Sequence, residues 1–152
     1  MLKNLFIKQQ EYENWANNLV IKSIMDSNNP NERVFELISQ IVIVHQNWLQ
    51  KIKKEQPYYK PWEKLTLDDC LKLSNENFNS DVTYISSLKD KDFEEFILFP
   101  FMAKPSKIAI QDLLTHLVNH ASYHRGQIIA LLKNKLDILP LTTYIAFASK
   151  EV

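Results

Sequence analysis

The sequence predicts an all-α protein in which about four long helices pack into one domain. Three observations lead to this prediction. The chain has one glycine and six prolines, and the prolines stand between long stretches whose apolar residues recur at helical spacing. Its single cysteine excludes an intrachain disulfide. At 152 residues, one domain spanning residues 1–152 is long enough to bury a hydrophobic core without a structural metal.

Each helix is expected from its own pattern of apolar residues. The first has Leu5, Tyr12, Trp15 and Leu19 on one side, which predicts an aromatic inner face. The second has the most regular pattern, so the residues of that pattern, including His45, are expected in the core. This seam consists of Val34, Ile38, Ile41, His45, Trp48 and Ile52. The expected helices span roughly residues 3–26, 32–55, 67–90 and 107–135, followed by a short helix after Pro140.

The later helices are expected to begin at polar caps. Thr66 should cap the third helix, whose apolar stripe indicates packing more than chemistry. Ser106, after Pro105, should cap the fourth. Between these helices, the phenylalanine-rich stretch from Asp92 to Met102 is expected to form a strand-like or irregular cover over one end of the helices. The inward stripe of the fourth helix is expected to be Leu113, Leu117, His120, His124, Ile128 and Leu131.

The composition argues against several classes of partner. Eighteen basic and eighteen acidic side chains cancel, so no overall field attracts nucleic acid or an anionic membrane. The N-terminal residues lack the apolar segment and cleavage site of a secretory signal, and no apolar run reaches the roughly 20 residues that cross a bilayer. We therefore expect a cytoplasmic protein with a small-molecule substrate.

The histidines form the most informative motif. His116, His120 and His124 are spaced four residues apart, so each adjacent pair lies on one helix face about 5–6 Å apart and can clamp a metal ion. The inward stripe passes through the last two, which we take as the ligand pair. His116 is then a bystander or a partner of a ligand. His45, in the core of another helix, is the remaining histidine and the expected third ligand.

Three histidine ligands with an open coordination position are typical of catalytic zinc, although nickel, iron(II) or manganese can use the same nitrogens. The alternative is that these histidines only make hydrogen bonds in the core. Tyr12 and Trp15 are candidates to roof a substrate pocket over the metal, or else simple core residues. Cys70 is interpreted as an ordinary thiol.

The lone glycine, Gly126, lies in a helix interior, where glycine costs about 1 kcal/mol relative to alanine. We expect that another helix approaches its backbone closely. Arg125 and Gln127 flank it and are expected to point away from the core, toward the surface.

The segment HLVNHASYHRGQIIALL, from His116 to Leu132, resembles the DinB-like superfamily, which is grouped with the YfiT-like thiol transferases. His45 with Trp48 and the segment YENWAN add to the resemblance. It implies an up-down-down-up four-helix bundle, a divalent ion on His45, His120 and His124, and a homodimer. It also implies chemistry with a low-molecular-weight thiol such as bacillithiol, mycothiol or glutathione. The tail at Leu141 to Tyr144 lacks an acidic residue that the family often carries there.

Three functions remain open from the sequence. The first is a metal-dependent thiol S-transferase. The second is a hydrolase with a metal-bound hydroxide, for which neither Asp112 nor Glu13 offers a convincing base. The third is a non-enzymatic, stress-related module that binds a metal or another ligand.

Overall fold

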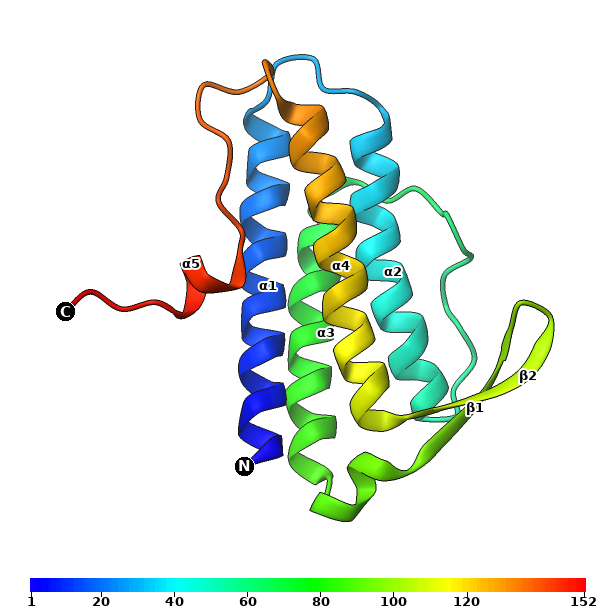
Figure 1. Ribbon diagram of the computed structural model, residues 1–152. Coiled ribbons are helices and arrows are strands. Elements are labelled where there is room, and N and C mark those ends of the chain that lie inside the picture. Colours follow the sequence, from blue (N-terminus) through cyan, green and yellow to red (C-terminus); the bar gives the residue numbers. More distant parts are fainter.

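The structure is a computed structural model that describes residues 1–152, and it is dominated by four long helices (Figure 1). The chain ascends through α1, descends through α2 and α3, and ascends again through α4 in the view of Figure 1. Helices α1 and α2 each pack against both α3 and α4. None of the helices combines the length and apolar character that crossing a membrane requires. The elements are α1 (Leu2–Asp26), α2 (Arg33–Ile52), α3 (Leu67–Ser87), η1 (Asp90–Glu94), β1 (Phe96–Phe101), β2 (Lys104–Ala109), α4 (Ile110–Leu132) and α5 (Tyr144–Ala148).

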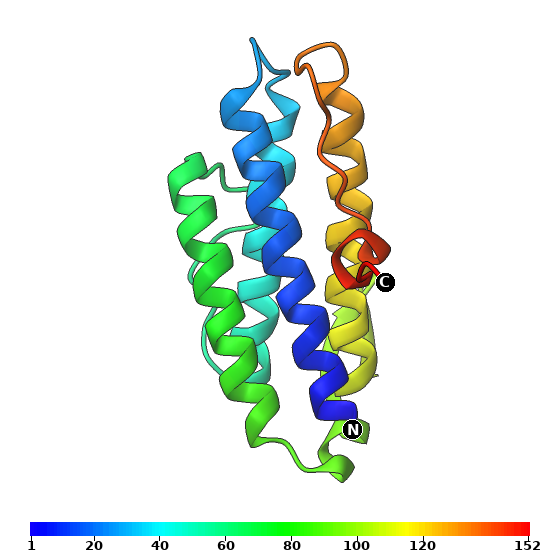
Figure 2. The ribbon, with the colours of Figure 1, turned by 90° about the vertical axis from the view of Figure 1, so that its left-hand side faces the viewer.

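The helix positions confirm most of the pattern analysis. Thr66 caps α3 as expected, because its Oγ1 accepts a hydrogen bond from the backbone nitrogen of Asp69 at 3.1 Å. The expected cap at Ser106 is wrong. Ser106 lies in β2, opposite Phe99 of β1, and α4 begins only after Ala109. The short α5 follows Pro140, and the turned view in Figure 2 shows this C-terminal segment running back along α1 and α4.

A two-stranded antiparallel hairpin, β1 and β2, joins α3 to α4. Strand β1 lies within the segment from Asp92 to Met102 that was expected to be strand-like or irregular, whereas its partner β2 was not predicted. The hairpin projects sideways from the helices rather than covering their end (Figure 1). Its inner side packs on the helices through Phe99, whose ring lies edge-on to Trp48 at 5.2 Å. Its outer side leaves Leu98 75% and Met102 82% exposed. The turn has positive φ at Met102 and Ala103 without a glycine, which is uncommon for such residues.

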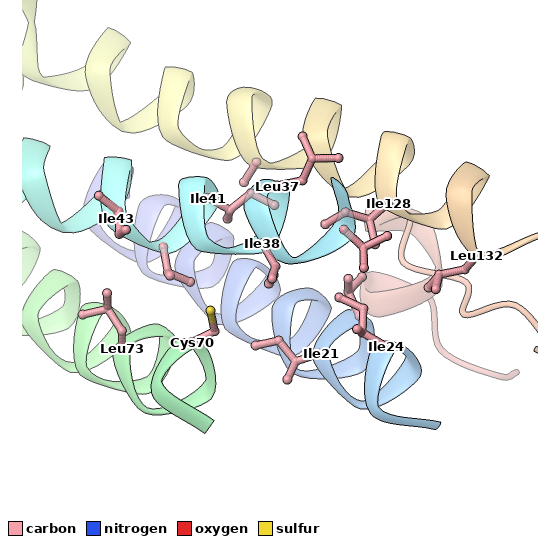
Figure 3. Close-up of a cluster of buried hydrophobic side chains, with 14 residues drawn as sticks. Ile21, Ile24, Leu37, Ile38, Ile41, Ile43, Cys70, Leu73, Ile128 and Leu132 are labelled. Carbon is pink, nitrogen blue, oxygen red and sulfur yellow. The ribbon is translucent and has the colours of Figure 1, made fainter. Parts of the chain in front are cut away.

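The apolar core is divided into two clusters. The larger one joins all four long helices (Figure 3). The smaller one lies at the end where η1 folds under the helices, with Phe6 stacked on Phe93 at 5.5 Å between ring centroids. Along α1 and α3, several polar residues between the two clusters are nevertheless buried. The buried polar residues of the four long helices are Gln10, Glu13, Asn17, Ser39, Gln40, His45, Ser74, Asn77, Asp81 and Arg125.

This polar layer changes the interpretation of three helices. The inner face of α1 is not mainly aromatic, because Gln10 and Glu13 are buried while Leu5 is 47% exposed. Helix α3 buries Asp81 where packing alone was expected. In α4, Arg125 is only 1% exposed, so the expectation that it points to the surface is wrong.

Gly126 also differs from expectation. It is exposed on α4, and a Cβ atom built there would meet nothing within 4 Å, so no helix approaches its backbone. The glycine therefore weakens α4 without a packing benefit within this chain.

The substitution Gly126→Ala should accordingly stabilise the protein by about 1 kcal/mol, because alanine has the higher helix propensity and the added methyl group has room. Urea unfolding followed by circular dichroism measures the change. A loss of stability would show that the backbone at Gly126 is contacted in solution.

Candidate functional site

His120 and His124 lie together on one flank of α4, and their Nε2 atoms are 3.2 Å apart. Both rings are partly buried. Two nitrogen ligands at 2.0–2.1 Å from a tetrahedral ion stand about 3.4 Å from each other, so the spacing of the pair matches shared coordination of one ion. Neither side chain is in the fully buried stripe of α4, which passes instead through Leu117, Ala121 and Arg125.

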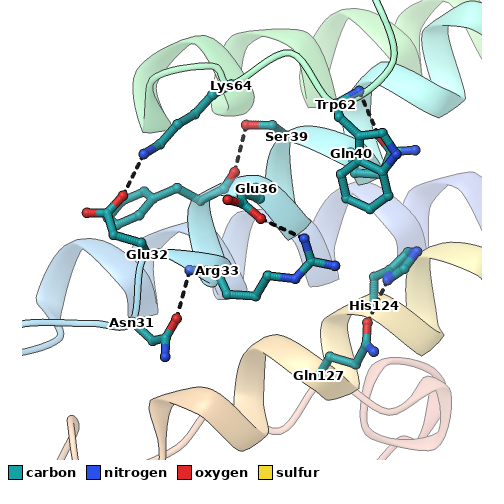
Figure 4. Close-up of polar contacts among 11 residues, drawn as sticks. Asn31, Glu32, Arg33, Glu36, Ser39, Gln40, Trp62, Lys64, His124 and Gln127 are labelled. Carbon is teal, nitrogen blue, oxygen red and sulfur yellow. Dashed lines mark hydrogen bonds and ion pairs between the residues drawn. The ribbon is translucent and has the colours of Figure 1, made fainter.

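Gln127 fixes the ring of His124. The side-chain Oε1 of Gln127 accepts a hydrogen bond from His124 Nδ1 at 2.7 Å (Figure 4). The proton of a neutral His124 is therefore on Nδ1, and its Nε2 carries a lone pair directed toward His120. This tautomer suits metal binding through Nε2, and the orientation of a ligand ring by a neighbouring acceptor is usual in metal sites.

The environment keeps His120 neutral. Burial, followed by the charges of His124, His116 and His45, lowers the pKa of His120 to about 4. His120 can therefore offer a lone pair at any pH above about 4.

His45 has a different partner from the one expected. Its ring is buried, 5% exposed, and Nε2 lies 2.8 Å from Oδ2 of Asp81 on α3. Burial opposes a charged ring, but the Asp81 carboxylate, its hydrogen bond and the charge of Glu13 together raise the pKa of His45. No group of three or more histidine, cysteine or acidic side chains is arranged to hold a metal ion. Two of the three predicted ligands therefore fit a metal, and the third is held by a carboxylate.

The remaining candidates occupy other surroundings. His116 is exposed, and its ring centroid is 5.6 Å from that of His120. Tyr12 donates a hydrogen bond to the backbone oxygen of Thr142 at 2.7 Å, and Trp15 packs against Phe147 of α5.

Tyr12 lines a groove of about 660 Å³ between α1, α4 and the C-terminal segment, and no histidine lines that groove. In this structure the two aromatic residues pack under the C-terminal segment and do not form a roof over the histidine pair.

A buried ion pair connects α1 to α4. Arg125 Nη1 lies 2.6 Å from Glu13 Oε1 and also donates to Oδ1 of Asn17 at 2.8 Å. The guanidinium of Arg125 additionally faces the ring of Tyr12, 5.3 Å from its centroid. Desolvation raises the pKa of Glu13, although Arg125 acts in the opposite direction. Glu13 is thus a carboxylate that depends on Arg125 to stay ionised.

This network was not predicted from the sequence, although the sequence contains a signal for it. Gln10, Glu13 and Asn17 are spaced by three and four residues, as are Ser74, Asn77 and Asp81 of α3. That spacing places each set on one helix face. Polar residues in the phase of the core predict a buried polar layer, which analysis of apolar residues alone cannot show.

Comparison with known families matches residues 9–147 of the chain to the model of the DinB family. This match covers most of the sequence, and the chain belongs to the DinB family. A search of curated proteins finds no match.

The ion pair generates a prediction for Arg125→Met, which leaves a buried carboxylate without its cation. Breaking a buried pair in this way costs about 3–5 kcal/mol, so the free energy of unfolding at pH 7 should fall by that amount. The raised pKa of Glu13 means that the folded state takes up a proton before the unfolded state does. The loss of unfolding free energy caused by Arg125→Met should therefore shrink as the pH falls toward 4.5, the ordinary pKa of a glutamate side chain.

Urea unfolding at pH 7 and pH 5 measures this dependence. The double variant Glu13→Gln with Arg125→Met is the control, and it should recover much of the loss at pH 7 because no buried charge remains. A loss of unfolding free energy that is equal at both pH values, or that is unchanged in the double variant, would contradict a buried ion pair between Glu13 and Arg125.

Proposed function

We propose that this protein binds one divalent metal ion through His120 and His124, with His45 as the third ligand, and acts as a transferase that uses a low-molecular-weight thiol. The observation that carries the proposal is the pair of Nε2 atoms 3.2 Å apart, one with its lone pair oriented by Gln127. Membership of the DinB family supports it. With that membership we also propose the up-down-down-up four-helix bundle, a homodimer and a cytoplasmic location.

His45 joins this proposal on one condition. Its ring must give up the contact between Nε2 and Asp81, or offer its other nitrogen to the metal. The raised pKa of His45 means that a proton competes with the metal at this ligand, and this competition persists above the ordinary value of 6.5. Metal binding through three histidines should therefore strengthen as the pH rises past neutrality.

The residues of this chain have distinct roles in the proposed chemistry. A bound zinc, nickel, iron or manganese ion would favour the thiolate form of a thiol and so supply a nucleophile. His120 and His124 hold the ion, and Gln127 orients His124. Cys70 cannot replace the external thiol, because it is buried and burial raises its pKa to about 11.

The hydrolase alternative finds little support in the geometry. A hydrolase needs a general base near the metal, but the hydrogen bonds of His120 and His124 involve each other and Gln127 rather than a carboxylate. Glu13 is paired with Arg125, and Asp81 becomes available only where His45 leaves it for the metal. A metal- or ligand-binding module without catalysis uses the same ligands, and activity measurements separate it from the transferase.

Metal titration by calorimetry tests the binding site. The wild-type chain should bind one zinc or nickel ion, and His124→Ala should weaken binding by at least 100-fold because one of two converging nitrogens is lost. Gln127→Met should weaken it by about 10–100-fold through loss of ring orientation. The exposed His116 supplies the matched control, since His116→Ala should change affinity little.

The same titration at several pH values tests His45. Affinity should rise between pH 5 and pH 8, and His45→Ala should flatten the part of this rise above pH 6.5. An affinity that does not change over this range argues against histidine ligands.

Thiol transfer is tested with monochlorobimane as the electrophile and bacillithiol, mycothiol or glutathione as the thiol. The metal-loaded protein should accelerate conjugation of at least one of them, and His120→Ala should abolish the acceleration while His116→Ala retains it. Metal binding at the predicted site without any acceleration would favour the non-enzymatic module.

A further inference from the structure

A small cavity lies inside the polar layer, away from the histidine pair. It offers about 10 Å³ of space for the centre of a water-sized molecule. Side chains of α1, α2 and α3 enclose it, and neither His120 nor His124 lines it. The lining residues are Gln10, Glu13, Asn14, Asn17, His45, Ser74, Asn77, Phe78 and Asp81.

Several lining atoms are buried without a hydrogen bond. They are both amide atoms of Gln10, Oε2 of Glu13 and Oδ1 of Asp81, whereas Oε1 of Glu13 is paired with Arg125. Gln10 is 1% exposed, Glu13 2% and Asp81 1%, so bulk water does not reach these side chains. Each unpaired buried polar atom costs about 1–3 kcal/mol, which makes a set of this size around one cavity unfavourable unless a molecule inside bonds to them.

The charges and the volume determine what that molecule can be. Glu13 already faces Arg125, and Asp81 already accepts from His45, so the occupant does not need to carry charge. The unpaired atoms are three acceptor oxygens and one amide donor, so the occupant must both donate and accept hydrogen bonds. A volume of about one probe sphere holds a single water molecule and nothing larger.

We propose that this cavity is the binding site of one internal water molecule that bridges Gln10, Glu13 and Asp81. The water joins two ion pairs that share no direct hydrogen bond, Glu13 with Arg125 and Asp81 with His45. Through it, one polar network connects all four long helices.

Two measurements on the metal-free wild-type protein test this site. A crystal structure at about 1.2 Å resolution should show one density peak in the cavity, at about 2.7–3.2 Å from atoms of Gln10, Glu13 and Asp81. Oxygen-17 magnetic relaxation dispersion should detect one long-lived internal water that Gln10→Met removes, because methionine fills the position without bonding to water.

A matched variant makes the dispersion result specific. Gln111→Met makes the same chemical change on α4 outside the cavity and should retain the water signal. An empty cavity, or Gln10 rotated to bond directly to Glu13, overturns the proposal. A density peak at metal–oxygen distances would show a cation and would also overturn the proposal. If Gln10→Met fails to fold, the density in the wild-type crystal structure still tests whether the cavity holds a water molecule.

Discussion

The burial of two opposite charge pairs in the middle of the helices is the constraint on which the rest of the structure depends. Glu13 with Arg125 and His45 with Asp81 are all within 5% of complete burial, and they separate the two apolar clusters. Charges removed from water in this way require fixed partners. Because the partners come from α1, α2, α3 and α4, a shift in the relative position of these helices would leave a charge uncompensated. The apolar clusters supply the driving force for folding, and the ion pairs restrict how the helices align.

Apolar periodicity was sufficient to predict the long helices and the burial of His45, and the capping preference of threonine predicted the cap at Thr66. Apolar periodicity did not predict features that depend on other residues, namely the hairpin and the buried Arg125. The hairpin sequence contains neither the glycine nor the Asn-Gly pair that normally signals a tight turn, so its turn at Met102 and Ala103 could not be foreseen. Arg125 was assigned to the surface because it points away from the predicted apolar seam, and only its partner Glu13, more than 100 residues away, explains its position.

The candidate site was predicted only in part, because some of its contacts are local in the sequence and others depend on the tertiary structure. Spacing of four residues places His120 beside His124 whatever the tertiary structure, so that pair could be read from the sequence. The environment of His45 depends on which helix faces it, and the sequence does not reveal that Asp81 is opposite. Gln127 was likewise assigned to the surface, although it hydrogen-bonds to His124. The histidine pair is thus a local feature, whereas the third proposed ligand belongs to the buried charge network.

The network and the proposed metal site share His45, and the central claim is that His45 can exchange Asp81 for a metal ion held by His120 and His124. The most direct measurement is a crystal structure of the zinc-loaded protein with anomalous scattering at the zinc edge. The account predicts one zinc peak bonded to nitrogens of all three histidines at about 2.0–2.1 Å. A zinc-loaded structure in which His45 remains outside the coordination sphere, or in which no zinc lies between His120 and His124, would contradict it.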